Sequence, residues 1–217
     1  MRIIIACAGS SAKWGGHLGV PRHLVPMGGE PLLHRTVRQA LAHSGDVRVI
    51  SADDQRYKVD GVQWHEAPQR TPNEFATTLP WWSAESRTVL LLGDTYYTDD
   101  AMATITGFEP VRWQMFGRKG ASALTGTPWG EYFASSWWPQ NRQMLLEHLE
   151  KVILARAAGI ARRCTGWEIL RSIQRTPLNE HVVHPFWFAE IDDATDDIDF
   201  PADYARHPAA TPEVASV

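Results

Sequence analysis

The N-terminal 35 residues constrain the fold more than any other stretch of this 217-residue chain. They open with a short run of apolar, mostly β-branched residues, Ile3 to Ala8, which is typical of a strand buried on both faces of a parallel sheet. The run ends in a loop of small residues, Gly9 to Gly16, that contains Lys13. Because small residues leave backbone N–H groups open to an anion, the stretch predicts a phosphate-binding loop at the carboxyl end of the first strand.

Three motifs in this stretch carry a resemblance to a known family. They are Ala6-Cys7-Ala8-Gly9-Ser10-Ser11-Ala12-Lys13, Pro21-Arg22-His23-Leu24 and Gly29-Glu30-Pro31-Leu32-Leu33. Their order resembles the N-terminal signature of the nucleotidyltransferases with a GT-A-like fold, which include the sugar-1-phosphate nucleotidyltransferases and the molybdenum-cofactor guanylyl- and cytidylyltransferases. The chain departs from the family pattern at Ser11, where glycine is usual, at Lys13, where arginine is usual, and at Arg22, where lysine is usual.

The resemblance implies a single-domain α/β fold with a mostly parallel, Rossmann-like central sheet flanked by helices. We expect this domain to span residues 1–207, with a nucleotide half at about 1–105 and an acceptor half at about 106–207. Residues 208–217 are expected to form a disordered tail. Residues 111–116 alternate between polar and apolar side chains, which predicts a half-exposed strand in the acceptor half.

Two later motifs predict a metal site. Asp94 follows a buried apolar run, Val89 to Leu92, and Asp199 stands just before a helix that begins with proline. The segment Ile198-Asp199-Phe200-Pro201-Ala202-Asp203-Tyr204 resembles the C-terminal motif of the same family. Carboxylate oxygens suit Mg²⁺ or Mn²⁺, so Asp94 and Asp199 are the expected ligands, with Asp197 in reserve. The alternative is that these aspartates are ordinary turn or helix-capping residues.

The resemblance also implies how a nucleotide is held. The backbone amides of the first loop would bind the β- and γ-phosphates together with Lys13, and Arg22 would stabilise charge on the α-phosphate. Lys13 and Arg22 are thus the expected catalytic residues, and Thr77 is expected to contact the base. The nucleotide-binding set as a whole comprises Ala8, Gly9, Ser10, Ser11, Lys13, Arg22 and Thr77.

Residues 106–185 match no motif of the family, and this is where we expect acceptor choice to be encoded. Arg118 and Lys119 could bind an acceptor phosphate and Glu131 could accept hydrogen bonds from hydroxyl groups, although an exposed hairpin with ordinary charges explains them equally well. Arg156, Arg162 and Arg163 form a basic cluster. The favoured interpretation is a helix end exposed to solvent, and the alternative is a phosphate-binding site.

Three functions are compatible with these residues. The first is a metal-dependent nucleotidyltransferase that joins an NMP from an NTP to a sugar 1-phosphate or similar phosphate monoester and releases pyrophosphate. The second is a GT-A-type glycosyltransferase that uses a nucleotide sugar, and the third is a non-catalytic nucleotide-binding homologue. The paired basic residues Lys13 and Arg22 favour the first, because a triphosphate needs both charges and a diphosphate sugar does not.

Composition and charge limit the partners and the location that we expect for this protein. A net charge of −4 gives no global basic surface, so nucleic acid is not an expected partner. The two cysteines lie far apart in the sequence, which favours reduced thiols and a cytoplasmic location. No apolar run approaches the roughly 20 residues of a membrane span, and neither a signal peptide nor a membrane partner is expected. A homo-oligomer is compatible with the sequence.

Overall fold

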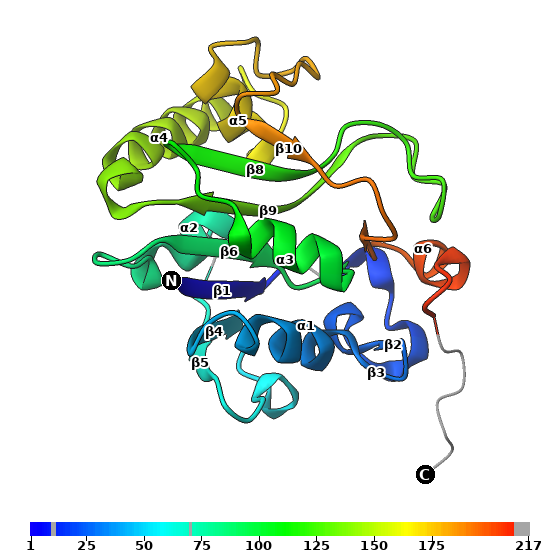
Figure 1. The fold of residues 1–217 in the computed structure, drawn as a ribbon. Coiled ribbons are helices and arrows are strands. Elements are labelled where there is room, and N and C mark those ends of the chain that lie inside the picture. Colours follow the sequence, from blue (N-terminus) through cyan, green and yellow to red (C-terminus); the bar gives the residue numbers. More distant parts are fainter. Residues whose placement is uncertain (10–11, 70, 211–217) are drawn as a thin grey trace.

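A seven-stranded sheet, in the order β10-β8-β9-β6-β1-β4-β5, forms the centre of the computed structural model, which describes residues 1–9, 12–69 and 71–210 (Figure 1). Neighbouring strands are parallel except where β9 pairs with β6 and β8. The strands span Arg2–Cys7 (β1), Asp46–Ser51 (β4), Gln63–Glu66 (β5), Thr88–Leu92 (β6), Trp113–Arg118 (β8), Glu131–Trp137 (β9) and Phe188–Glu190 (β10).

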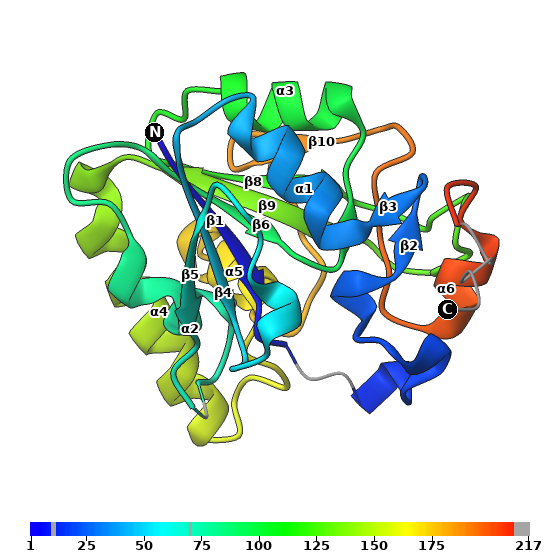
Figure 2. The same cartoon turned by 90° about the horizontal axis from the view of Figure 1, so that it is seen from below.

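Helices cover both faces of the sheet, as Figure 2 shows from below. Helices α1 and α3 pack on one face, and α2, α4 and α5 pack on the other. This arrangement confirms the expected α/β fold class with a mostly parallel sheet. The helices span Leu32–Leu41 (α1), Glu74–Thr78 (α2), Asp99–Gly107 (α3), Arg142–Ala157 (α4), Gly166–Gln174 (α5) and Pro201–Arg206 (α6).

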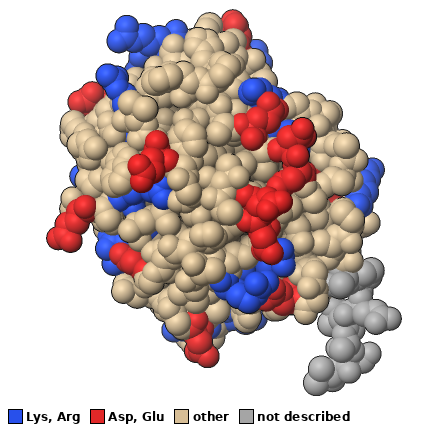
Figure 3. Space-filling view, in the orientation of Figure 1, with Lys and Arg blue, Asp and Glu red and all other residues tan. Residues whose placement is uncertain are grey.

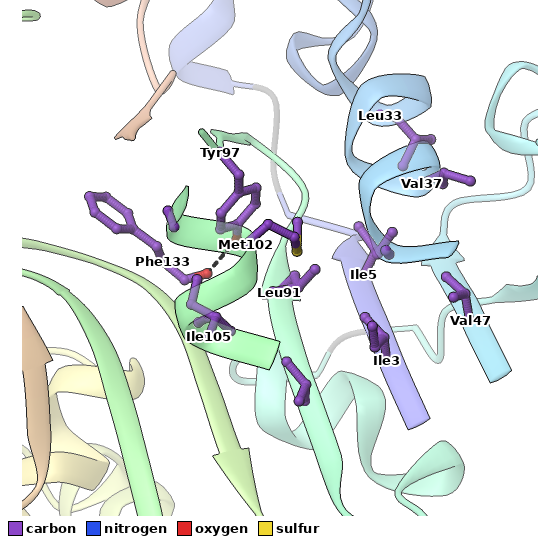
Figure 4. Packing of buried hydrophobic residues seen from close by; sticks show 14 of the residues in the cluster. Ile3, Ile5, Leu33, Val37, Val47, Leu91, Tyr97, Met102, Ile105 and Phe133 are labelled. Carbon is purple, nitrogen blue, oxygen red and sulfur yellow. Dashed lines mark hydrogen bonds between the residues drawn. The ribbon is translucent and has the colours of Figure 1, made fainter. Parts of the chain in front are cut away.

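Strand β1 is buried on both faces, as its apolar run predicts. Ile3 and Ile5 pack with α1 and α3, whereas Ile4 points into the core of the opposite face, and all three are fully buried (Figure 4). Burying one such side chain contributes about 1.5–3 kcal/mol, so the strand is a major source of stability. The hydroxyl of Tyr97 donates to the carbonyl of Phe133 at 2.6 Å and ties the segment after β6 to β9.

Strand β8 differs from the expected half-exposed strand. It begins at Trp113 and is buried on both faces, because Phe116 packs in the α1/α3 core while Trp113 and Met115 pack beneath α4 and α5. The polar Gln114 is only 5% exposed. The alternation of side chains in this segment therefore does not mark a water-facing side, because helices far along the sequence cover both sides.

A third apolar cluster joins the two ends of the chain beside the main sheet. It contains Trp14 from the first loop and Ile198 and Tyr204 from the C-terminal segment. The Tyr204 hydroxyl donates to the carbonyl of Pro26 at 3.0 Å. Two small antiparallel ribbons lie in this region, Pro26–Met27 (β2) with Glu30–Pro31 (β3), and Thr95–Tyr96 (β7) with Asp196–Asp197 (β11).

The first three residues of the expected disordered tail are part of the fold. Gly28 N–H donates to the Ala209 carbonyl at 2.7 Å, and Ala210 forms a bridge with Met27. The composition of the tail did not reveal this pairing, because it depends on the backbone of the distant β2–β3 turn. Residues 211–217 lie outside the described part of the chain.

One face of the molecule carries its charges unevenly. In Figure 3 acidic side chains gather on the right of the face shown. Asp99 and Asp100 at the start of α3 and Asp192 and Asp193 before β11 are exposed. Lysine and arginine side chains on the same face form separate small groups. Among the described residues, none of the helices combines the length and the apolar character that a membrane span would need.

Candidate active site

Asp94 lies directly beyond β6, at the edge where the parallel strands β1 and β6 both end. The preceding Gly93 donates its N–H to the Ala6 carbonyl at 2.9 Å, and a Cβ on it would overlap the Cys7 sulfur. A glycine is therefore required for the chain to pass β1 this closely. The carboxylate of Asp94 is 9% exposed, so the strand delivers a nearly buried acidic group to the sheet edge.

The C-terminal segment brings two more carboxylates to the same place. The Ile198 N–H donates to the backbone carbonyl of Asp94 at 2.9 Å, and the residues on either side, Asp197 and Asp199, lie next to Asp94. One carboxylate oxygen from each of the three aspartates lies within 4.8 Å of the others. Asp94 and Asp199, the two predicted ligands, therefore come together, and the reserve residue Asp197 joins them.

Asp197 is the least satisfied member of this cluster. Its Oδ1 atom is buried and has no hydrogen-bond partner in the described part of the structure. Burial, and then repulsion from Asp94 and Asp199, raises the pKa of Asp197 well above its usual value. A cation between the three carboxylates would relieve both effects.

The two predicted basic residues lie against these carboxylates. The Arg22 guanidinium is 7% exposed, forms an ion pair with Asp94 at 2.5 Å and forms a second with Asp199. Lys13 forms an ion pair with the other oxygen of Asp199. A Cβ on Gly9 would lie 3.0 Å from the Arg22 guanidinium, so the first loop passes closely over this residue.

A cavity of about 300 Å³ opens at the carboxyl end of β1. Ala8, Gly9 and Thr77, predicted to bind nucleotide, line it together with Arg22 and Asp94. Ser10 and Ser11, which complete the predicted loop, lie outside the described residues. The cavity is thus bounded by the first loop on one side and by the start of α2 on the other.

Sequence reasoning missed five polar residues that line this cavity, among them Glu74, Tyr132 and His23. The Tyr132 hydroxyl donates to the Glu74 carboxylate, and burial raises the pKa of Glu74. His23 is buried, its ring lies 2.9 Å from the Tyr57 hydroxyl, and burial lowers its pKa to about 4. No local pattern identifies these residues, because Glu74 reads as the start of a helix and Tyr132 lies on a strand of the acceptor half.

A larger cavity of about 760 Å³ adjoins the first, shares Arg22 and Asp94 with it and is also lined by Asp197 and Asp199. Lys119 and Glu131, two of the predicted acceptor residues, line it. Lys119 is paired with Glu190 at 2.8 Å. Glu131 accepts a hydrogen bond from the indole of Trp129 at 2.6 Å, and burial, followed by the nearby Asp199, raises its pKa to about 7.

Arg118, the third predicted acceptor residue, is not among the residues that line this cavity. Its guanidinium forms an ion pair at 2.7 Å with Asp196, which is fully buried and also accepts hydrogen bonds from Ser122 and Thr125. Arg118 therefore holds the loop after β8 onto β11. Its partner lies 78 residues away in the sequence, so the local pattern gave no sign of this role.

Three solved structures share this fold over nearly their whole length. A protein of Bacillus anthracis assigned as a glucose-1-phosphate thymidylyltransferase, solved with sucrose, aligns with a TM-score of 0.62 and 14% identity, covering 100% of this chain and 97% of that one. The CTP:phosphocholine cytidylyltransferase of Streptococcus pneumoniae aligns with a TM-score of 0.58 and 13% identity, covering 94% and 96%. The 4-diphosphocytidyl-2C-methyl-D-erythritol synthase of Anaerococcus prevotii aligns with a TM-score of 0.59 and 12% identity, covering 96% of each chain.

These alignments define the class of fold. All three structures are of nucleotidyltransferases, and the chain has the GT-A-like nucleotidyltransferase fold that the sequence motifs predicted. At 12–14% identity the likeness is one of fold. No protein-family model and no curated protein sequence matches the chain.

Proposed function

We propose that this protein is a nucleotidyltransferase that transfers an NMP from an NTP to a phosphate monoester, such as a sugar 1-phosphate, and releases pyrophosphate. The observation that carries the proposal is the position of the charged groups. Asp94, Asp197 and Asp199 meet Arg22 and Lys13 where two cavities of different size adjoin. Such an arrangement can hold two phosphate-bearing substrates on either side of one reacting phosphorus.

The carboxylates fit a divalent cation. They offer oxygen ligands that suit Mg²⁺ or Mn²⁺, and the unpartnered buried Oδ1 of Asp197 is the kind of atom that a cation satisfies. When bound, the ion would supply neutralising charge for the nucleotide phosphates. The three aspartates would hold it.

The reaction needs no protein nucleophile. An oxygen of the acceptor phosphate attacks the α-phosphorus, a new P–O bond forms, and the bond to the β-phosphate breaks with pyrophosphate as the leaving group. Arg22 would exchange its ion pairs with the aspartates for contacts with the α-phosphate and would stabilise the charge that builds there. Lys13 would exchange Asp199 for the β- and γ-phosphates.

The two cavities would divide the substrates between them. The smaller cavity, between the first loop and Thr77, would take the base, and most of its lining belongs to the proposed nucleotide half at about 1–105. The larger cavity would take the acceptor, with Glu131 accepting hydrogen bonds from hydroxyl groups and Lys119 near the phosphate, and most of its lining belongs to the proposed acceptor half at about 106–207. A cytoplasmic location fits the small phosphorylated substrates.

Pyrophosphate release tests the proposal. The assay uses each of the four NTPs with Mg²⁺ or Mn²⁺ and a panel of sugar 1-phosphates, and compares wild type with Asp94→Asn. The matched control is Asp192→Asn, which removes an exposed carboxylate outside both cavities. We expect release with one NTP, lost by at least about a hundredfold in Asp94→Asn and unchanged in the control.

The other outcomes identify the alternatives. Metal-dependent binding of a nucleotide sugar without pyrophosphate release would contradict the proposal and indicate a glycosyltransferase. Binding of an NTP without turnover, equally strong in Asp94→Asn, would indicate a non-catalytic nucleotide-binding protein.

A further inference from the structure

The large cavity has two chemically different ends. One end holds Asp94, Asp197 and Asp199. The other end merges with a third cavity of about 260 Å³, whose lining includes Arg163 and Arg171 but none of the three aspartates. The basic end therefore lies away from the place where we expect phosphoryl chemistry.

Arg171 is fixed at this basic end. It is only 9% exposed, and its Nη1 atom donates to Glu168 at 2.7 Å and to the carbonyl of Leu178 at 2.8 Å. The buried Nε atom has no partner in the described chain. Glu168 neutralises this arginine, because it accepts hydrogen bonds from Arg171 and from Thr165 and is itself buried.

Arg163 adds a positive charge that no described residue neutralises. It is exposed, it lines the large cavity and the third cavity, and it makes no ion pair or hydrogen bond with the described residues. Arg163 and Arg171 line the same two cavities, and the pKa of Arg171 is lowered by burial, against the opposing effect of Glu168, with a smaller lowering from the positive charge of Arg163. Arg162 also lines the third cavity. An anion between these guanidinium groups would offset their like charges.

The loop that carries Arg163 is held in place without a ligand. The backbone N–H of Arg162 donates to the Asn179 side chain at 2.8 Å, and Asn179 donates back to the carbonyl of Ile160 at 2.8 Å. Thr165 and Glu168 form a capping box that starts α5. The basic end is therefore largely pre-organised, which lowers the entropic cost of binding there.

We propose that the acceptor carries a second anionic group, remote from the phosphate that reacts, and that Arg163 and Arg171 bind it. The inference deepens the proposed function and rests on it. An acceptor of this class is a bisphosphate, or a phosphate monoester with a distal carboxylate. Its body would lie between the two ends, beside Trp129 and Trp167, which line the large cavity. Guanidinium groups bind both kinds of anion in paired hydrogen bonds.

Calorimetric titration with a graded series of probes tests the inference without knowledge of the natural acceptor. Each probe is an alkane-α,ω-diol bisphosphate, compared with the alkyl monophosphate of the same chain length, in the presence of Mg²⁺. A parallel series with a terminal carboxylate distinguishes the two kinds of distal anion. We expect one chain length to bind wild type at least about tenfold more tightly than its monophosphate.

The variants locate the effect. Arg163→Ala should lose most of this preference, and Arg163→Lys should retain part of it. Arg156→Ala is the matched control, because Arg156 is an exposed arginine at the end of α4 that lines neither cavity. The control should keep the full preference.

Either of two results would overturn the inference. One is that no chain length favours the doubly charged probe over its monophosphate. The other is that Arg163→Ala and Arg156→Ala reduce the preference equally, which would indicate attraction to the general field of the protein. The titrations measure acceptor binding and the pyrophosphate assay measures turnover, so either of these results would leave the proposed function standing as long as pyrophosphate is released.

Discussion

The two ends of the large cavity rest on different kinds of backbone. The acidic end comes from the carboxyl edge of β6 and from β11, which a backbone hydrogen bond from Ile198 to Asp94 ties together. The basic end comes from the loop that carries Arg163 and from α5, which follow the long helix α4 and belong to no strand. Groups that must meet a reacting phosphorus are thus fixed by the sheet, whereas groups that choose an acceptor lie where loops can vary.

Two adjacent aspartates at the acidic end should respond in opposite ways to substitution. Asp196 is buried and paired with Arg118, so Asp196→Ala leaves that guanidinium and the hydroxyls of Ser122 and Thr125 without their shared acceptor and should cost about 3–5 kcal/mol of the free energy of unfolding. Asp197 has an unpartnered buried oxygen and repelling neighbours, so Asp197→Asn should leave stability unchanged or raise it. Urea unfolding at neutral pH measures both.

Metal binding completes this prediction. Mg²⁺ should raise the unfolding temperature of wild type, and Asp197→Asn should lose that increase. Equal destabilisation by the two substitutions would contradict the division between a structural and a ligand-binding aspartate.

The next prediction compares arginines at the two ends. Arg22→Lys keeps the charge but loses the fork that spans Asp94 and Asp199, so kcat should fall by about a hundredfold to a thousandfold, with little change in the KM for acceptor. Arg163→Lys should change mainly the KM for acceptor. Steady-state kinetics with both substrates varied separates the two effects. A fall in kcat for Arg163→Lys would contradict the expected difference between the two arginines.

That Asp94 and the first loop lie close together could be predicted from the sequence for a physical reason, while their roles stay a prediction. Parallel strands end at one edge of a sheet, so Asp94 and the first loop had to lie together once β1 and β6 were recognised. Asp199 required the resemblance as well, because its approach depends on the apolar cluster of Trp14, Ile198 and Tyr204, which no short pattern reveals.

The acceptor side was harder to predict because its contacts are distant in sequence. The sequence left Arg118 open to bind an acceptor, whereas in the fold it pairs with Asp196. The sequence likewise predicted a half-exposed strand for β8, whereas α4 and α5 cover it. The cluster of Arg156, Arg162 and Arg163 was divided by the fold, since only the last two reach a cavity. Whether a charged side chain is paired, buried or open to a ligand is decided by tertiary contacts that local patterns do not contain.

His23 offers a smaller test of how tightly the acidic end is built. Its ring is buried beside Arg22, and burial lowers its pKa from 6.5 to about 4. The unfolded chain therefore binds the proton more readily, so the stabilising contribution of neutral His23 is fully present above the unfolded pKa and is lost as pH falls through the folded pKa. The shift corresponds to at most about 3 kcal/mol across that interval.

The measurement is the pH dependence of the free energy of unfolding, from urea titrations between about pH 4 and 6.5. His23→Asn removes the titrating ring while keeping a hydrogen-bonding group near Tyr57, so its stability should vary less steeply with pH than that of wild type. His43→Asn, at an exposed position, is the control and should follow the wild-type slope. Because wild type and His23→Asn share every other titrating group, the difference between their slopes isolates His23. Equal slopes in His23→Asn and wild type would contradict the prediction and would mean that water reaches this ring at the sheet edge beside Arg22.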